Sequence, residues 1–519
     1  MDLNQALNCI YYGPPGTGKT YSCIRKAVQI IEQVNDSIFE KDYSQTEVEN
    51  LYKKYQADGR IAFMTFHPSF AYEDFVEGLK PFRNEKEDLY YDVEDGIFKQ
   101  LSISASYALY LTQQHRLLDN RSSKSKNFDA LYFEFIDYLK RMMLEEAKEV
   151  IFETKMAKAV YLVNINQNST ISLSYEQGER TYQVTKSVIA KLYRKFDSTS
   201  HLDKERDTFT KLAGASKLSL YRAVFDRLKS FENTRDRTYR YLLNGRKFMG
   251  QQVQNELYLH MKKEVSHFDF QGLHTEDYKK TGNFVLIIDE INRGNLPAIM
   301  GELITLIEPD KRAGQAHAIS TILPYSKESF SVPKNLYILG SMNTVDRSIT
   351  NIDTAMRRRF YFKEVAPLPN LLNEKHNNQL KEEAGSYHTN TTGGNKVDLQ
   401  RLLTVINSRL TSLLDKEHTV GHAYLMPVLS SEDPNATLQY IFYEQLIPLF
   451  EEYFFNDNGK LHSLLGDDFF SNSNSNGVTK NHVKDYPQDT PIQLKLVKLE
   501  GNDFANAIIN IYKHDSAHR

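Results

Sequence analysis

Residues 7–26 read LNCIYYGPPGTGKTYSCIRK, and this stretch decides the fold. It contains the pattern GxxxxGK[ST], in which Gly13, Gly18, Lys19 and Thr20 occupy the fixed positions. The apolar, β-prone residues before the loop predict a strand, and the spacing of apolar residues after it predicts a helix. A glycine loop between a strand and a helix is the context that distinguishes a phosphate-binding loop from an accidental match.

The chemistry of this loop follows from its backbone. Glycines allow successive N–H groups to turn inward around phosphate oxygens, and the positive end of the following helix lies beside them. Lys19 is placed to reach the β and γ phosphates, and the Thr20 hydroxyl is placed to ligate Mg²⁺. The sequence therefore predicts a nucleotide-binding protein that uses Mg²⁺. The predicted nucleotide-binding residues are Gly13, Pro14, Pro15, Gly16, Thr17, Gly18, Lys19, Thr20 and Tyr21.

Length and composition indicate a soluble chain with several domains. A single core rarely grows beyond about 250–300 residues, so a chain of 519 residues predicts more than one domain. The net charge of −3 points to neither a nucleic-acid nor a membrane partner, so any DNA contact must come from a local patch or another subunit. The two cysteines, Cys9 and Cys23, fit buried thiols better than a disulfide framework. We recognise no signal segment or membrane span and expect a cytoplasmic location.

A second apolar stretch ends in two acids. Residues 284–295 read FVLIIDEINRGN, which predicts a buried parallel strand that ends at Asp289 and Glu290. Carboxylates at such a place are costly unless they serve a metal or a reaction. We expect Asp289 to hold Mg²⁺ through water, and Glu290 to orient or deprotonate the water that attacks the γ phosphate. The alternative is that the pair only caps the next helix.

Two further segments carry polar groups that could complete a site. Residues 335–348, NLYILGSMNTVDRS, predict another buried strand with Asn343 just past its end. The Asn343 amide could reach the γ phosphate and the attacking water, or it could bond only local turn backbone. Residues 351–360, NIDTAMRRRF, predict a short helix that ends in three arginines. One of them could reach a neighbouring subunit's nucleotide as an arginine finger, or they could complement the C-terminal end of the helix.

The patterns along the chain predict an α/β fold with a central parallel sheet, an inserted α/β subdomain and a helical C-terminal lid. The insertion is indicated by alternating, Val- and Tyr-rich segments followed by helical patterns. Its arginines and lysines are interspersed with acids, so a solvated helix face is favoured over a phosphate-contacting surface. The predicted ranges are 1–114 for the first part of the core, 115–280 for the insertion, 281–368 for the second part of the core and 369–519 for the lid.

The segment NKVD at residues 395–398 superficially matches the guanine-reading motif of small GTPases. It follows no predicted strand, and Asp398 is well placed to cap the helix that we predict from residue 399. We therefore interpret Asp398 as a helix cap.

Together the motifs resemble one family, the McrB-type AAA+ NTPases, which are the motor subunits of modification-dependent (5-methylcytosine) restriction systems. The segments at 66–79 and 340–349 are much more specific than a glycine loop alone. The motifs that carry the resemblance are GPPGTGKT at 13–20, FHPSFAYEDFVEGL at 66–79, LIIDEINRGN at 286–295, GSMNTVDRSI at 340–349, RRRF at 357–360 and GHAYLM at 421–426.

The resemblance implies a role for each matched residue. In its terms, Lys19 and Thr20 belong to Walker A, Asp289 and Glu290 belong to Walker B, and Asn343 is the sensor 1 residue. The other implied assignments are Asp346 and Arg347 as signature residues, Arg357 and Arg358 as arginine-finger candidates, and His422 as a lid residue close to the nucleotide.

The resemblance also implies a substrate and partners. The family uses GTP where most AAA+ proteins use ATP, and it assembles as a hexameric ring. It works with a separate McrC-type subunit that supplies the nuclease, and it contacts DNA through that complex. Because the first glycine of the loop is Gly13, we expect a short form without the N-terminal domain that recognises modified DNA.

A different class of function also fits part of the sequence. A MoxR-like AAA+ chaperone would remodel protein partners with ATP and would touch no DNA, and the near-neutral charge is compatible with it. The segment MNTVDRS at 342–348 and the residues after His67 favour the restriction motor instead. A nucleotide-gated scaffold with little turnover is disfavoured by Glu290, because a scaffold needs no water-activating acid.

Overall fold

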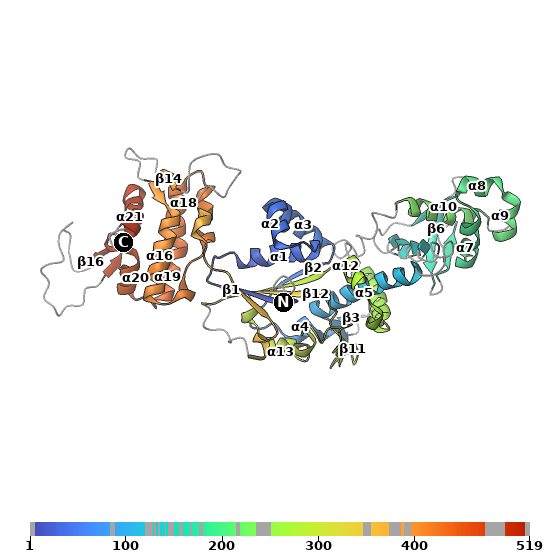
Figure 1. The fold of residues 1–519 in the computed structure, drawn as a ribbon, viewed down its shortest axis with the longest axis horizontal. Helices are drawn as coiled ribbons and strands as arrows, with labels where there is room; N and C mark the ends of the chain where they lie inside the picture. The colour runs from blue at the N-terminus through green and yellow to red at the C-terminus, as the bar shows by residue number, and fades with distance from the viewer. Residues whose placement is uncertain are drawn as a thin grey trace.

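The computed structural model arranges the chain in three parts along one long axis (Figure 1). The core with the central sheet lies in the middle, the lid lies at one end and the inserted subdomain lies at the other. Among the described residues, no helix combines the length and the apolar character that crossing a bilayer would require. The structure describes residues 6–83, 89–119, 128, 131–132, 135–136, 138–140, 142–143, 150–154, 159–166, 169–175, 180–213, 218–234, 251–345, 354–372, 386–388, 396–472 and 494–513.

The core is built on a five-stranded parallel sheet. Its strands are β1 (Asn8–Gly13), β2 (Ile61–Thr65), β9 (Phe284–Asp289), β12 (Leu336–Asn343) and β13 (Tyr361–Glu364). They lie in the order β13-β1-β12-β9-β2, which confirms the predicted α/β AAA+ fold. Because the strands run in the same direction, the carboxyl ends of β1, β12 and β9 meet at one edge. The glycine loop, Asn343 and the two acids therefore lie at that edge.

Helices cover both faces of the sheet, and the side chains of β9 alternate between them. Val285 and Ile287 pack with the helices that follow the glycine loop, whereas Leu286 and Ile288 pack on the opposite face. A strand that is apolar on both faces is typical of a buried parallel sheet. Both cysteines are buried free thiols on the first of these faces, as the sequence predicts.

Helices and two hairpins surround the sheet and complete the core. The helices are α1 (Lys19–Glu32), α2 (Asp36–Asp42), α3 (Gln45–Ala57), α4 (Tyr72–Phe75), α5 (Ile97–Asp119), α11 (Gln251–Ser266), η5 (Phe270–Gly272), α12 (Thr275–Thr281), η6 (Ile291–Arg293), α13 (Leu296–Met300), α14 (Leu303–Leu306) and α15 (Thr354–Arg357). The two antiparallel hairpins are β3 (Glu77–Arg83) with β4 (Leu89–Asp95), and β10 (Thr321–Ile322) with β11 (Ser329–Phe330).

The inserted subdomain has a hydrophobic cluster of its own, made of residues between Phe128 and Phe231. Its sheet is antiparallel in the order β5-β6-β7-β8, and it contains the alternating, Val- and Tyr-rich segments that indicate the insertion. Helix α11 packs instead on α5 of the core, where Met261 joins Tyr107 and Leu111. The elements are β5 (Ile151–Glu153), β6 (Ala159–Ile165), β7 (Ile171–Ser174), β8 (Tyr182–Val184), α7 (Lys186–Lys195), α8 (Thr199–Lys204), α9 (Arg206–Ala213) and α10 (Leu218–Thr234).

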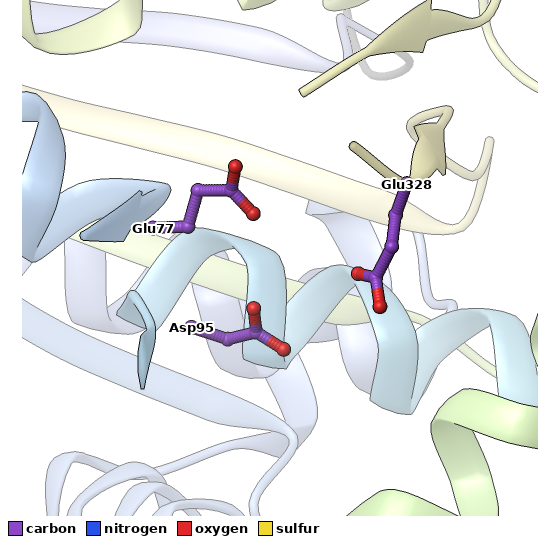
Figure 2. A group of neighbouring side chains, drawn as sticks. All are labelled: Glu77, Asp95 and Glu328. Atoms are coloured by element: carbon purple, nitrogen blue, oxygen red, sulfur yellow. The ribbon is translucent and has the colours of Figure 1, made fainter. Parts of the chain in front are cut away.

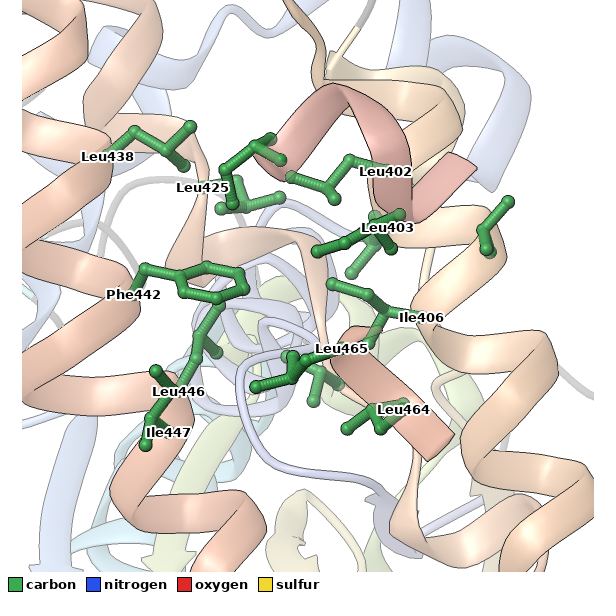
Figure 3. Close-up of a cluster of buried hydrophobic side chains, with 14 of the residues drawn as sticks. Leu402, Leu403, Ile406, Leu425, Leu438, Phe442, Leu446, Ile447, Leu464 and Leu465 are labelled. Atoms are coloured by element: carbon green, nitrogen blue, oxygen red, sulfur yellow. The ribbon is translucent and has the colours of Figure 1, made fainter. Parts of the chain in front are cut away.

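The lid is mainly helical and is held together by a separate core, in which Phe442 packs among leucines and isoleucines from several helices (Figure 3). Asp398 accepts a hydrogen bond from the backbone N–H of Arg401, which confirms it as the cap of α16. The elements are η7 (Pro369–Leu372), β14 (Ser386–His388), β15 (Lys396–Asp398), α16 (Leu399–Leu413), η9 (Lys416–His418), η10 (His422–Tyr424), α17 (Met426–Leu429), α18 (Pro434–Ile441), the π-helical turn η11 (Phe442–Leu446), α19 (Ile447–Tyr453), α20 (Asn458–Leu465), η12 (Asp467–Phe469), β16 (Phe470–Asn472), β17 (Leu494–Leu496) and α21 (Gly501–Lys513).

Candidate nucleotide site

The glycine loop joins β1 to α1 through a compact turn. Gly16 and Gly18 have φ angles of 73° and 81°, a left-handed conformation that favours glycine. The Lys19 side chain folds back over the loop, where its Nζ donates to the carbonyl oxygen of Pro14 at 2.6 Å. The Thr17 hydroxyl donates to the same oxygen at 3.0 Å. The loop is therefore held by its own side chains, with the Lys19 ammonium buried against it.

Two hydroxyl groups converge on Asp289. Thr20 Oγ1 donates to Asp289 Oδ1 at 2.9 Å, and Ser341 Oγ from β12 donates to the same oxygen. Carboxylate and hydroxyl oxygens are the donors that Mg²⁺ prefers, and this ion is usually held by one or two carboxylates together with substrate phosphates. The side chains of Thr20 and Asp289 therefore fit a magnesium ion at the end of the glycine loop.

Ser341 was not identified from the sequence, although a signal was present. It precedes Asn343 by two residues on β12, so both side chains point to the same face of the strand. The signal is therefore a polar residue in a buried strand, two positions before Asn343 and on the same face.

Glu290 follows the end of β9 in a left-handed conformation with φ 52°. A non-glycine residue in this region stores of order 1–3 kcal/mol of strain, and such residues cluster at functional sites. Its Oε1 accepts a hydrogen bond from Asn343 Nδ2 at 2.5 Å, and its Oε2 lies 3.4 Å from Arg293 Nε. The Asn343 amide thus contacts the second acid and is not limited to local turn backbone. The backbone bend turns the Glu290 carboxylate toward the end of β12.

The lid contacts the glycine loop directly through its backbone. The N–H of Gly421 donates to the carbonyl oxygen of Pro15, and the N–H of Ala423 donates to that of Gly16, both at 2.9 Å. A Cβ at Gly16 would lie 2.5 Å from the ring of Tyr424, so that ring lies against the loop. The sequence marks this segment as a motif but assigns a role only to His422, whereas Gly421, Ala423 and Tyr424 make the contacts. Their contacts place the GHAYLM segment on the loop.

His422 lies between the two residues that bond to the loop, but its ring points elsewhere. Its Nδ1 accepts a hydrogen bond from the backbone N–H of Leu368, in the connection between core and lid, at 3.3 Å. Burial lowers the pKa of His422 below its ordinary value, which favours the neutral ring that can accept this bond. In this conformation the ring therefore fastens the lid to the connection that precedes it.

The three arginines at the end of α15 occupy different environments. Arg357 and Arg358 are exposed, and the Arg357 guanidinium lies 5.8 Å from the centre of the Phe362 ring. Arg359 is buried and forms an ion pair with Glu308 at 2.7 Å. It also donates to the carbonyl oxygen of Ala355 one turn earlier, as expected for an arginine that complements its own helix. Two of the three arginines therefore face outward.

Of three other predicted residues, Tyr21 lies in the part of the chain that the structure describes. It occupies the first turn of α1, where the Arg25 guanidinium is 5.9 Å from its ring centre. Asp346 and Arg347 lie outside the described residues. Their implied signature role stays a prediction.

A cavity of about 460 Å³ lies between the loop and the lid, beside Gly16. The rings of Tyr424 and Tyr440 provide aromatic walls, and Thr437 and Gln445 provide hydrogen-bonding groups. Apolar walls with a few polar groups are typical of small-molecule sites. The cavity could therefore accommodate a ring system of a small ligand.

A second group of acids lies away from this edge. Glu77, Asp95 and Glu328 converge near the start of α5 (Figure 2). The ammonium of Lys99 lies among them, at 2.7 Å from Glu77, 2.5 Å from Asp95 and 2.9 Å from Glu328. Lys262 from α11 adds a second ammonium at 2.8 Å from Asp95. These lysines provide the positive charge that a metal would bring, so the group is an ion-pair network that joins two hairpins to two helices.

The parallel sheet, the glycine loop and the two acids define an AAA+ P-loop NTPase. The model of the AAA domain (dynein-related subfamily) matches residues 218–360, which contain β9, β12 and the arginines. The model of the McrB alpha-helical lid domain matches residues 398–462, which contain the segment that contacts the loop. The lid of this chain is therefore similar to the lid of McrB-type proteins, and its core is similar to other AAA domains.

Two relatives agree with this placement. The chain is 35% identical over 200 residues to the Type IV methyl-directed restriction enzyme EcoKMcrB subunit of Escherichia coli (strain K12), which covers 36% of this chain and 40% of that protein. It is 31% identical over 90 residues to the Type II restriction enzyme BsuMI component YdiS of Bacillus subtilis (strain 168), which covers 16% of this chain and 26% of that protein. The chain thus spans less than half the length of either relative.

Proposed function

We propose that this chain hydrolyses a nucleoside triphosphate, GTP in preference to ATP, as the motor subunit of a McrBC-like restriction complex. Hydrolysis would drive DNA translocation and would activate a separate nuclease subunit in defence against foreign DNA. The observation that carries the proposal is the Glu290 carboxylate, held by Asn343 beside the Thr20–Asp289 pair. A protein that only binds nucleotide has no need for a second acid in this position.

The groups at the carboxyl edge of the sheet have separate roles in the proposed hydrolysis. The backbone of the glycine loop binds the phosphates, and Lys19 leaves the carbonyl of Pro14 to neutralise the β and γ oxygens. Glu290 orients the attacking water and accepts its proton, while the Asn343 amide fixes the direction of the carboxylate. Thr20 and Asp289 would hold Mg²⁺, which when bound supplies positive charge to the phosphate oxygens.

The proposed partners are neighbouring copies of this chain, a nuclease subunit and DNA, and they rest on two exposed arginines and on the family resemblance. Arg357 and Arg358 are exposed on the surface of the core, where a neighbouring copy could bring its nucleotide close to them. We propose that copies assemble into a ring, a hexamer by the family resemblance, in which these arginines complete each site. The McrC-type nuclease subunit would bind this ring, and DNA would be contacted through the complex.

Steady-state hydrolysis of GTP and ATP, measured side by side with and without the nuclease subunit, tests this proposal. Lys19→Ala serves as the blank, because it removes the ammonium that faces the phosphates. Lys53→Ala, which removes an exposed lysine from α3, is the matched control and should leave hydrolysis unchanged. Preference for GTP with stimulation by the nuclease subunit supports the restriction motor. Preference for ATP without stimulation would contradict it and favour a MoxR-like chaperone.

A further inference from the structure

The core contains a fully buried arginine whose four hydrogen bonds all go to neutral acceptors. Arg312 donates to the carbonyl oxygens of Ile307 at 3.0 Å, Pro333 at 3.1 Å and Leu336 at 2.9 Å. Its fourth bond goes to Asn8 Oδ1 at 2.8 Å. Burial lowers the pKa of Arg312 to about 9, so the guanidinium still carries its charge at neutral pH. Burying a charge among neutral groups is energetically costly unless its hydrogen-bonding groups are satisfied.

The bonds of Arg312 join segments that are far apart in the sequence. Asn8 is the first residue of β1, Leu336 is the first residue of β12, and Ile307 ends the turn after α14. All of these groups lie at the amino ends of the strands. The glycine loop and Asn343 lie at the opposite, carboxyl ends. Arg312 therefore joins, at their amino ends, β1 and β12, two of the three strands whose carboxyl ends carry the site.

The hydrogen-bond network around Arg312 also includes the segment that carries the exposed arginines. Asn8 Nδ2 donates to the carbonyl oxygens of Ile307 at 2.9 Å and of Arg359 at 3.0 Å. The Arg359 side chain pairs with Glu308, the residue after Ile307. The end of the arginine segment is thus held by its backbone and by its side chain to one turn of the core. Arg357 and Arg358, just before it, are left facing outward.

We propose that Arg312, with Asn8 and the Arg359–Glu308 ion pair, is a positioning device that fixes the direction in which Arg357 and Arg358 project toward a neighbouring copy. Arg312 itself touches no nucleotide. The inference rests on the proposed function, because it assumes that these arginines act at a neighbour's site. It adds a mechanical connection between the sheet of one copy and hydrolysis in the next.

A mixing experiment isolates this role. Acceptor chains carry Arg357→Ala and Arg358→Ala, so each keeps its own sheet-edge groups but offers no arginine. Donor chains carry Glu290→Gln, so they offer arginines but do not hydrolyse. Each population alone should be inactive, and the mixture should recover hydrolysis at acceptor sites that face a donor. This recovered rate measures the arginines of the donor alone.

The positioning residues are then changed in the donor only. Glu308→Gln removes the charge that holds Arg359 and, because Glu308 is partly exposed, should leave the fold intact. Arg312→Met removes the buried guanidinium and its four hydrogen bonds. Misplacing a catalytic group by about 1 Å can cost about 100-fold, so we expect the recovered kcat to fall about 10-fold to 100-fold with an unchanged KM. Arg409→Met is the matched control, because Arg409 also donates to two carbonyl oxygens, those of Leu464 and Ile511, but within the lid.

The outcomes separate the inference from the function on which it rests. If the unmodified donor restores no hydrolysis, the shared site of the proposed function is wrong. If it restores hydrolysis and the Glu308→Gln donor, folded by thermal melting, restores it equally, the positioning role is refuted. A loss of kcat with Glu308→Gln, none with Arg409→Met, and recovery with Glu308→Asp supports it. If Arg312→Met fails to fold, the comparison of Glu308→Gln with Glu308→Asp still tests whether the positioning of the arginine segment matters for hydrolysis.

Discussion

The backbone contact between lid and glycine loop can be broken by one methyl group. Gly421 has φ −76°, so alanine fits its backbone without strain. A Cβ there would, however, lie 1.9 Å from both the carbonyl carbon and the oxygen of Gly16. Because nonbonded carbon atoms approach to about 3.5 Å, the segment must move by roughly 1.5 Å. Gly421→Ala therefore separates the lid from the loop without altering the core of the lid.

The cost can be worked from the two hydrogen bonds that this movement breaks. The bonds from Gly421 to Pro15 and from Ala423 to Gly16 are both 2.9 Å long. At about 1 kcal/mol each, their loss weakens docking by about 2 kcal/mol. That free energy corresponds to about a 30-fold change in the equilibrium between docked and undocked lid. Since the docked lid orders the loop that binds phosphates, nucleotide affinity should fall by up to the same factor.

The assay is equilibrium binding of a fluorescent GTP analogue, with thermal melting measured on the same samples. We expect Gly421→Ala to raise Kd about 10-fold to 30-fold with little change in melting temperature. Gly459→Ala is the control in the same lid, because the nearest atom to its new Cβ is a side-chain oxygen of Asp457 at 3.2 Å. An unchanged Kd for Gly421→Ala would refute the idea that lid docking orders the loop.

Three further predictions concern the magnesium site and the ion-pair network. Ser341→Ala should raise the Mg²⁺ concentration for half-maximal hydrolysis about 10-fold, since groups that orient a metal ligand typically contribute 10–100-fold; an unchanged Mg²⁺ titration would contradict this. Lys99→Met should destabilise the core by about 3–5 kcal/mol in a denaturant melt, because it leaves Glu77 and Asp95 buried without that cation. Lys80→Met, which breaks only exposed pairs, should cost under about 1 kcal/mol; equal costs for the two variants would be evidence against the buried network. Burial opposes ionisation of Glu77, but hydrogen bonds from Lys99 and Ser326 outweigh it and lower the Glu77 pKa. Its stabilising contribution is therefore present above the ordinary value near 4.5 and is lost as pH falls through the lower folded value. The melting temperature should drop in that acidic range, and the drop should be smaller in Lys99→Met. If the dependence of melting temperature on pH is the same in Lys99→Met, groups other than Glu77 cause the acid sensitivity.

The parts of the site that the sequence predicts are those encoded within short segments. The glycine loop is marked by its own motif, whereas Asp289 and Asn343 are each the polar last residue of an apolar strand, β9 and β12. Parallel strands bring such ends to one edge, so their proximity follows from the fold class. The cap at Asp398 is local in the same sense, and it was predicted for that reason.

Other features depend on contacts between residues that are far apart in the chain. The bond between Arg312 and Asn8 joins positions separated by 304 residues, and nothing near Arg312 marks it as buried. The docking of Gly421 on the loop is equally non-local. His422 was assigned to the nucleotide by resemblance, whereas its ring lies against Leu368 in this conformation. Such contacts are decided by packing between core and lid, for which a single sequence offers no local pattern.

The most direct test of Glu290 as the catalytic acid is single-turnover hydrolysis of GTP by Glu290→Gln, with nucleotide binding measured on the same protein. The substitution keeps the size of the side chain and its contact with Asn343 but removes the base. We predict near-normal GTP binding and a rate at least about 100-fold below the wild type, the usual contribution of a general base. A Glu290→Gln protein that hydrolyses GTP at the wild-type rate would contradict the assignment of Glu290 as the water-activating acid.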